Sequence, residues 1–213
     1  NMDSTFNPGS GFNNSVRAMV ISGNSIYATG AFATYDGLGA KGLAKLDKDS
    51  GALDTTFSTA TNITGGGELG SVIQVVGSSL FVGGYFSTYR GTGAEGIAKV
   101  DLTTGALVGG FPHATVFGSF IVQGLAYDGT SLYLGVCPSA GQYQSVAVGC
   151  AVKLNPTTGA IDTSFTTGQE FLLGNIHSMF IHGTSLYVSG YIFSHRGVTI
   201  PQFVKTNTSG DLD

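Results

Sequence analysis

The chain has 213 residues, a formal net charge of −4, and charged side chains at only 10% of its positions, against about 25% in ordinary globular domains. Its nine Lys and Arg residues form no cluster, and it has no run of about 18 apolar residues, so neither nucleic-acid binding nor membrane insertion is expected. The 42% apolar content is enough for a folded core, and 34 glycines indicate many turns.

The first predicted element in chain order is a short strand ending at Phe6. This element recurs at Phe57, Phe111 and Phe165, at intervals of 51, 54 and 54 residues. Each copy begins with an apolar strand, a tight turn and a second strand. A longer loop, a third strand, another tight turn and a fourth strand ending at the aromatic residue follow. The first strands are expected at residues 16–21, 72–76, 121–127 and 176–181.

The repeat unit determines the predicted fold class. Alternating apolar positions and Gly-containing turns indicate strands and hairpins, and no segment has a sustained helical period. Units of about 53 residues with four antiparallel strands each are typical of β-propeller blades. We therefore predict one all-β propeller domain spanning residues 1–213, with repeats at about 2–52, 53–106, 107–160 and 161–211.

The two ends of the chain leave two alternatives for the ring. Residues 2–6 have the sequence of a fourth strand, and the last copy stops soon after a third strand at 202–206. The N-terminal strand could pair with this last third strand and close a four-bladed ring. The other expectation is a piece cut from a longer array in a larger protein.

The repeated residues resemble a known family. The stretch MDSTFNPGSGFNNSVRAMVISGNSIYATGAFATYDG and its copies are similar to the delta-sixty repeats of bacterial propellers, although LVGGF replaces LDTTF in the third copy and SHRG replaces the YxG motif in the fourth. The resemblance covers all four copies. It implies a large secreted or surface-anchored bacterial protein, such as an adhesin or a fibre tip, and it brings no catalytic residues with it.

The turns that follow the third strands admit two interpretations. DKDSG at 47–51, DLTTG at 101–105 and NPTTG at 155–159 place Asp or Asn before Gly, as some calcium loops do. Only the first has two acidic residues, and none ends in a bidentate Glu. Asp or Asn opening a turn that ends in Gly is also ordinary hairpin chemistry, and we predict a structural turn and no metal.

Cys137 and Cys150 lie at the end of the second strand and the start of the third strand in copy three. Because these strands are expected to be antiparallel neighbours, we predict a disulfide between them, with two buried thiols as the alternative. The four His residues are scattered, so a metal site is not expected. No nucleophile motif, phosphate loop or paired carboxylate is visible, and we predict neither an enzyme nor a cofactor.

Strand parity suggests where a ligand would bind. With four antiparallel strands per blade, the loops between second and third strands share one face with the connections between blades, and the tight turns lie on the other. Tyr35 and Tyr89 recur at one position, which favours packing between blades. Copies three and four depart most from the repeat pattern. The candidate ligand-binding residues on the long-loop face are Tyr89, Arg90, Gln142, Tyr143, His195 and Arg196.

Two functions from different classes follow. The first is an extracellular or cell-surface binding module that recognises glycan, because few charges, many hydroxyl and amide groups, and aromatic rings suit neutral sugars. Its partners would be a glycan or a protein on a target cell, and a parent fibre would make it a trimer. The alternative is a structural or protein-interaction scaffold with no small-ligand site.

Overall fold

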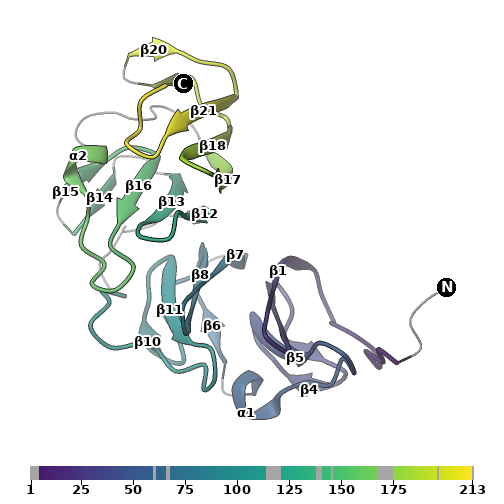
Figure 1. The fold of residues 1–213 in the computed structure, drawn as a ribbon. Helices are drawn as coiled ribbons and strands as arrows, with labels where there is room; N and C mark the ends of the chain where they lie inside the picture. Colours follow the sequence, from purple (N-terminus) through teal and green to yellow (C-terminus); the bar gives the residue numbers. More distant parts are fainter. Residues whose placement is uncertain are drawn as a thin grey trace. The chain divides into compact units, whose positions relative to one another are not determined.

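The computed structural model describes residues 5–59, 61–65, 68–113, 121–137, 141–144, 146–166, 175–195 and 197–212. Over these residues the fold is all-β apart from two helical turns, and the all-β class agrees with the sequence prediction. The chain divides into two compact units, Asn1–Val108 (unit 1) and Gly109–Asp213 (unit 2), and each unit contains two of the four repeats (Figure 1). The closed four-bladed ring and the single domain stay predictions.

The main sheets of the two repeats in unit 1 are equivalent three-stranded antiparallel sheets, and a short strand, β6, adds to the small hairpin of repeat 2. Repeat 1 has the sheet order β1-β2-β5, and repeat 2 has the order β11-β8-β7. Each repeat also has a small hairpin in the loop between its second and third strands. The elements of repeat 1 are β1 (Val16–Ser22), β2 (Ser25–Gly30), β3 (Thr34–Tyr35), β4 (Leu38–Gly39), β5 (Leu43–Asp47) and α1 (Thr55–Ser58). Those of repeat 2 are β6 (Ile63–Thr64), β7 (Glu68–Val76), β8 (Ser79–Tyr85), β9 (Thr88–Tyr89), β10 (Thr92–Gly93) and β11 (Ile97–Asp101).

Unit 2 repeats this arrangement. Repeat 3 has the sheet order β12-β13-β16, and repeat 4 has β17-β18-β21. The elements of repeat 3 are β12 (Ile121–Tyr127), β13 (Leu132–Cys137), β14 (Gly141–Tyr143), β15 (Val146–Val148), β16 (Ala151–Leu154) and α2 (Thr163–Thr166). Those of repeat 4 are β17 (Ile176–His182), β18 (Ser185–Gly190), β19 (Ser194–His195), β20 (Val198–Thr199) and β21 (Phe203–Asn207).

The predicted fourth strand is wrong in its extent. In each repeat the segment after the third strand makes one isolated bridge to that strand, at Leu53, Leu107, Ile161 and Leu212. After Leu53 the chain turns into α1, because the Asp54 side chain accepts a hydrogen bond from the Phe57 backbone N–H and caps the helical turn. Asp followed by two Thr residues is a local start signal for a helix, and here it overrides the strand pattern.

The predicted ring closure falls partly on residues 1–4, which lie outside the described residues. Thr206, in the third strand of repeat 4, bridges to Leu212. At this residue, the edge proposed for the N-terminal strand is therefore occupied by repeat 4's own chain.

The cores lie between consecutive repeats inside each unit. In unit 1, Tyr27, Leu43 and Phe57 pack in one cluster with Leu80 and Tyr89 from repeat 2. In unit 2, a second cluster joins Tyr133 and Phe165 with Met179, Leu186 and other residues of repeat 4. The apolar face of a sheet is buried only where a second sheet packs on it. Each repeat forms a sheet that covers the sheet of its neighbour, which explains why the sequence repeats. Among the described residues, no helix is long and apolar enough to cross a bilayer.

Candidate functional site

The tip of the loop between the second and third strands has the same contact in all four repeats. The hydroxyl groups of Tyr35, Tyr89 and Tyr143 donate hydrogen bonds to the carbonyls of Gly51, Gly105 and Gly159, at 2.8, 2.6 and 2.8 Å. In repeat 4, Nε2 of His195 lies 2.6 Å from the Gly210 carbonyl, and because a carbonyl only accepts, this nitrogen carries the proton. All four side chains are buried.

These bonds correct the prediction, made from strand parity, that the long loops lie on the face opposite the tight turns. The tip of the long loop in repeat 1 lies near a tight turn, because Tyr35 donates to Gly51 at the end of that turn. Connectivity fixes where a loop leaves the sheet, but not where its tip packs. In repeat 1, Phe32 and Tyr35 pack on Ala28, Ala44 and Leu46, so the loop folds across an apolar face of its own sheet.

The predicted ligand-binding residues therefore occupy different environments. Tyr89, Tyr143 and His195 are committed to buried structural bonds. The Arg90 guanidinium donates from Nη2 to the carbonyls of Phe57 (3.1 Å) and Thr104 (3.0 Å), and thus ties three segments of unit 1 together. The Gln142 side chain and Arg196 lie outside the described residues.

The predicted disulfide stays a prediction. Cys150 is buried, and its carbonyl accepts a hydrogen bond from the Val136 backbone N–H at 2.8 Å. Cys137 ends β13, and its side chain lies outside the described residues.

The Asp and Asn residues of the tight turns have structural roles, as the turn interpretation predicts. Asp47 Oδ1 accepts hydrogen bonds from the N–H groups of Asp49 and Ser50 and from the Ser50 hydroxyl, at 3.1, 2.8 and 2.7 Å. The bond from the Ser50 side chain is the main cause that lowers the pKa of Asp47. Asp101 and Asn155 make equivalent turn contacts. In the described part of the chain, no three His, Cys, Asp or Glu residues gather as a metal site would require.

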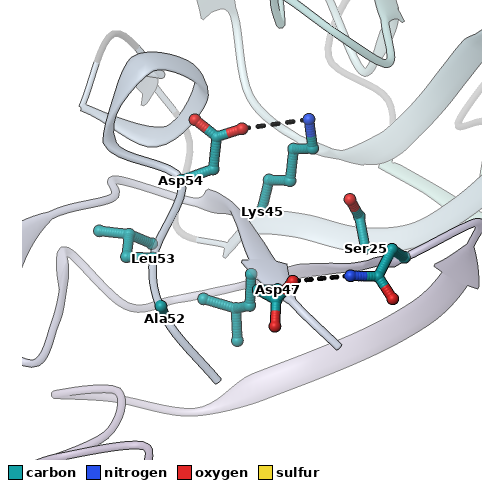
Figure 2. Close-up of a pocket in the computed structure, with 8 residues that line it drawn as sticks. Ser25, Lys45, Asp47, Ala52, Leu53 and Asp54 are labelled. Carbon is teal, nitrogen blue, oxygen red and sulfur yellow. Dashed lines mark hydrogen bonds and ion pairs between the residues drawn. The ribbon is translucent and has the colours of Figure 1, made fainter. Parts of the chain in front are cut away.

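A pocket of about 340 Å³, lined by both polar and apolar side chains, lies beside β5 (Figure 2). Its two charged contacts are an ion pair between Lys45 and Asp54 (3.1 Å) and a hydrogen bond from Asn24 to Asp47 (2.8 Å). Burial raises the pKa of Asp54, but the Phe57 N–H and Lys45 outweigh it, and the net pKa is lowered. Unit 2 has the same ion pair in Lys153 and Asp162, at 3.3 Å. The recurrence indicates that the pair stabilises the repeat.

The exposed aromatic residues of repeat 4 are a different feature. Tyr191 and Phe193 are 57% and 56% exposed, and they flank the buried Ile192. The His177 ring meets the Tyr191 ring edge to face, with centroids 5.3 Å apart. Two backbone hydrogen bonds between Tyr191 and Asn175 hold this part of the loop against the start of β17. We call Tyr191, Phe193 and His177 the aromatic platform.

The aromatic platform is not among the predicted ligand-binding residues, although the repeats contain a signal for it. The segment Gly190 to His195 matches GAFATY in repeat 1 and GYFSTY in repeat 2. Phe193 therefore stands where the other two repeats have Ala33 and Ser87. A large apolar side chain at a position that is small elsewhere, and exposed in the fold, is a candidate contact residue.

The comparisons with known proteins support the fold class. The model of the family described as "Domain of unknown function (DUF5122) beta-propeller" matches residues 24–57, within and just beyond repeat 1. A search of curated proteins found no match. The match supports a propeller-type repeat.

Solved structures that are similar to the chain include the following two. The computationally designed Ika8 protein is 12% identical, with a TM-score of 0.53, over 93% of this chain and 48% of that one. A chain of an S. cerevisiae complex of Dbp5 with Nup159, Gle1, IP6 and ADP is 11% identical, with a TM-score of 0.43, over 90% and 43%. The chain thus spans about half the length of these structures, and the likeness to the designed protein concerns the fold alone.

Proposed function

We propose that this protein is a non-enzymatic binding module that recognises glycan on a target surface through the aromatic platform of repeat 4. The observation that carries the proposal is the pair of exposed rings, Tyr191 and Phe193, on a loop that two backbone hydrogen bonds tie to Asn175, directly before β17. Aromatic rings that stay exposed on a rigid segment offer an apolar face at little conformational cost.

The chemistry of the platform fits a neutral sugar. A pyranose ring has an apolar face that stacks on aromatic rings, while its hydroxyl groups need donors and acceptors nearby. His177 provides a polar ring edge beside Tyr191, and Gln202 is exposed next to Gly190, to whose N–H its carbonyl binds at 3.0 Å. The low charge of the whole chain suits a neutral ligand better than an anionic one.

The wider biological setting belongs to the same proposal. The delta-sixty resemblance, with its adhesins and fibre tips, supports a location outside the cell or at its surface, and a role in adhesion. Sugar sites are weak singly because lost hydration offsets many new hydrogen bonds, so adhesion would use several copies, as a trimeric fibre would provide.

A scaffold that binds only proteins is the second candidate. It is favoured by the loop tips of repeats 1 to 3, where Tyr35, Tyr89 and Tyr143 are buried against their own turns and offer no rings to a ligand. The two candidates differ in whether the platform binds sugar.

The test is a glycan array probed with the protein displayed on a multivalent carrier. Tyr191→Ala and Phe193→Ala should each lower the apparent affinity for the captured glycan by about tenfold, equivalent to roughly 1.4 kcal/mol. Phe180→Ala is the matched control, because Phe180 is a half-exposed aromatic residue on another part of repeat 4. A blank array, or binding that survives both platform substitutions, would leave the scaffold candidate.

A further inference from the structure

The polar side chains of the pocket beside β5 lie on the face of repeat 1 that repeat 2 covers. Cross-strand register pairs Tyr27 with Lys45 on this face, and Ser25 with Asp47 one pair further along it. Tyr27 packs in the cluster shared with repeat 2, and its hydroxyl donates to the Leu102 carbonyl at 2.7 Å. Both repeats belong to unit 1, and with repeat 2 in place the Lys45 side chain is still 15% exposed. The pocket therefore remains open beside a covering repeat.

The Lys45 ammonium has hydrogen-bonding capacity that the protein does not use. An ammonium group has three N–H donors, and its one polar partner within the described parts of the chain is the Asp54 carboxylate, at 3.1 Å. The rings of Tyr27 and Phe57, with centroids 6.0 and 5.7 Å from Nζ, attract the positive charge without providing a lone pair. Two N–H groups are therefore left for water or for a ligand.

The equivalent lysine of unit 2 has a second partner. Lys153 lies 3.3 Å from the Asp162 carboxylate, and its ammonium also donates to the Thr208 carbonyl of repeat 4 at 3.2 Å. The two lysine side chains are exposed to almost the same extent, 15% for Lys45 and 17% for Lys153. The ion pair thus recurs as a structural contact, but of these two lysines Lys45 is the one without a backbone acceptor.

The other polar groups of the pocket are mainly acceptors. Lys45 and Asp54 reach toward each other from neighbouring segments, and the Asp47 carboxylate lies apart from them (Figure 2). Asp47 accepts a hydrogen bond from the Asn24 amide at 2.8 Å, and carboxylate oxygens have lone pairs for further donors. An anionic ligand would meet two carboxylates, and a cationic ligand would meet the ammonium. A neutral hydroxyl group suits both, because it accepts from an ammonium and donates to a carboxylate at the same time.

We propose that the pocket beside β5 binds a single neutral sugar residue, whose hydroxyl groups accept from Lys45 and donate to Asp54 and Asp47. A pyranose has hydroxyl groups on adjacent carbons, which matches a pocket whose donors and acceptors lie side by side. Ala52 and Leu53 also line the pocket and provide apolar contact for the C–H groups of the sugar ring.

The size of the pocket limits the ligand. Its volume of about 340 Å³ is at the lower end of the range of small-molecule sites, about 300–1,000 Å³, so it suits one sugar ring better than an oligosaccharide. This site lies in unit 1 and is separate from the aromatic platform of repeat 4. The inference therefore goes beyond the proposed function, and it stands whether or not the platform binds glycan.

The test is an NMR titration of the full chain, labelled with ¹⁵N, with the methyl glycosides of glucose, galactose and mannose. Binding of at least one of them should shift the backbone amide signals of residues 45–47 and 52–54. The dissociation constant should be on the order of 1 mM, because a single sugar residue makes few contacts. Glucuronate adds a negative charge to the same kind of ring and should bind about tenfold more weakly than the glucoside, or weaker still.

Two variants test the residues that the proposal names. Lys45→Met removes the ammonium, keeps an apolar side chain over the two rings, and should weaken binding about tenfold or more. Lys153→Met is the matched control, because it removes the equivalent ion pair from unit 2, and its dissociation constant should be unchanged.

The second variant combines Asn24→Ser with Asp54→Val. Repeat 2 has Ser78 and Val108 at these positions, because the Ser78 carbonyl accepts from Leu102 as that of Asn24 accepts from Lys48, and the Val108 N–H donates to Lys99 as that of Asp54 donates to Lys45. The fold should therefore tolerate both changes, while binding is lost.

Several results would overturn the proposal. They are amide signals of residues 45–47 and 52–54 that no neutral glycoside shifts, glucuronate that binds as tightly as the glucoside, and a Lys45→Met variant that binds as the unmodified chain does. Equal weakening in Lys153→Met would also overturn it, because the effect would then come from general destabilisation. Tyr191→Ala and Phe193→Ala should leave these shifts unchanged, so a failure of this site and a failure of the platform are distinguishable.

Discussion

The buried bond between Tyr89 and Gly105 offers a quantitative test of the repeat's architecture. Tyr89→Phe keeps the ring in place and removes only the hydroxyl, which donates to the Gly105 carbonyl at 2.6 Å. Tyr89 is fully buried and Gly105 is buried too, so water does not replace the lost donor without a structural change. Leaving a buried carbonyl without its partner costs about 1–3 kcal/mol. We expect the free energy of unfolding to fall by that amount.

The assay is urea denaturation followed by tyrosine fluorescence and circular dichroism. Tyr35→Phe and Tyr143→Phe remove the equivalent bonds to Gly51 and Gly159, and they should cost about as much as Tyr89→Phe. Tyr191→Phe is the control, because Tyr191 is exposed and its change should stay within about 0.5 kcal/mol.

Two results would refute the structural role of these tyrosines. The first is a Tyr89→Phe variant as stable as the unmodified chain, within about 0.5 kcal/mol. The second is a Tyr143→Ala variant that loses glycan binding but keeps its stability, because truncating a buried aromatic residue should cost about 3–5 kcal/mol.

Two further predictions concern pH and the thiols. Burial raises the pKa of Tyr89 to about 12 from 10.0, so the folded state keeps its proton at a pH where the unfolded chain releases it. The resulting stability is fully present below pH 10 and is lost as the pH rises towards 12; denaturation across this range should be less pH-dependent in Tyr89→Phe. For the predicted Cys137–Cys150 disulfide, intact-mass analysis after alkylation of the unreduced, denatured protein should detect no modified thiol. Two alkylated thiols would rule the disulfide out. If the disulfide is present, its short loop should stabilise the fold by about 3 kcal/mol or less.

Local patterns predicted the parts of the fold that depend on neighbours in sequence. The strands of residues 16–21 and 176–181 appear as β1 and β17 with nearly the predicted bounds. The Asp47 turn also formed as expected, because an Asx side chain and a Gly four residues later suffice to close it. The prediction of a strand ending at Phe57 is wrong, because Asp54 caps a helical turn at Thr55–Ser58 and the chain leaves the edge of the sheet after Leu53.

The candidate site was harder to predict because it depends on burial. The departure of their loops from the repeat pattern predicts Tyr143 and His195 as ligand-binding residues, yet both side chains reach the glycine of their own turn. Tyr191 and Phe193 are in the same kind of loop and are exposed. Composition does not separate these cases, because a Tyr side chain suits either a buried hydrogen bond or an exposed ring.

The all-β class, the period of about 53 residues and the order of strands and turns are predictable from alternation, glycine placement and repetition along the chain. Which faces of the sheets are covered depends on how the repeats pack. Tyr27 and Tyr133 are buried because a following repeat packs on them, whereas the equivalent Tyr187 is half-buried between the exposed rings of Phe180 and Phe203. The same residue at the same register thus has a core role or a surface role according to its spatial neighbour, and side-chain burial is a property of the packed sheets, which no local pattern encodes.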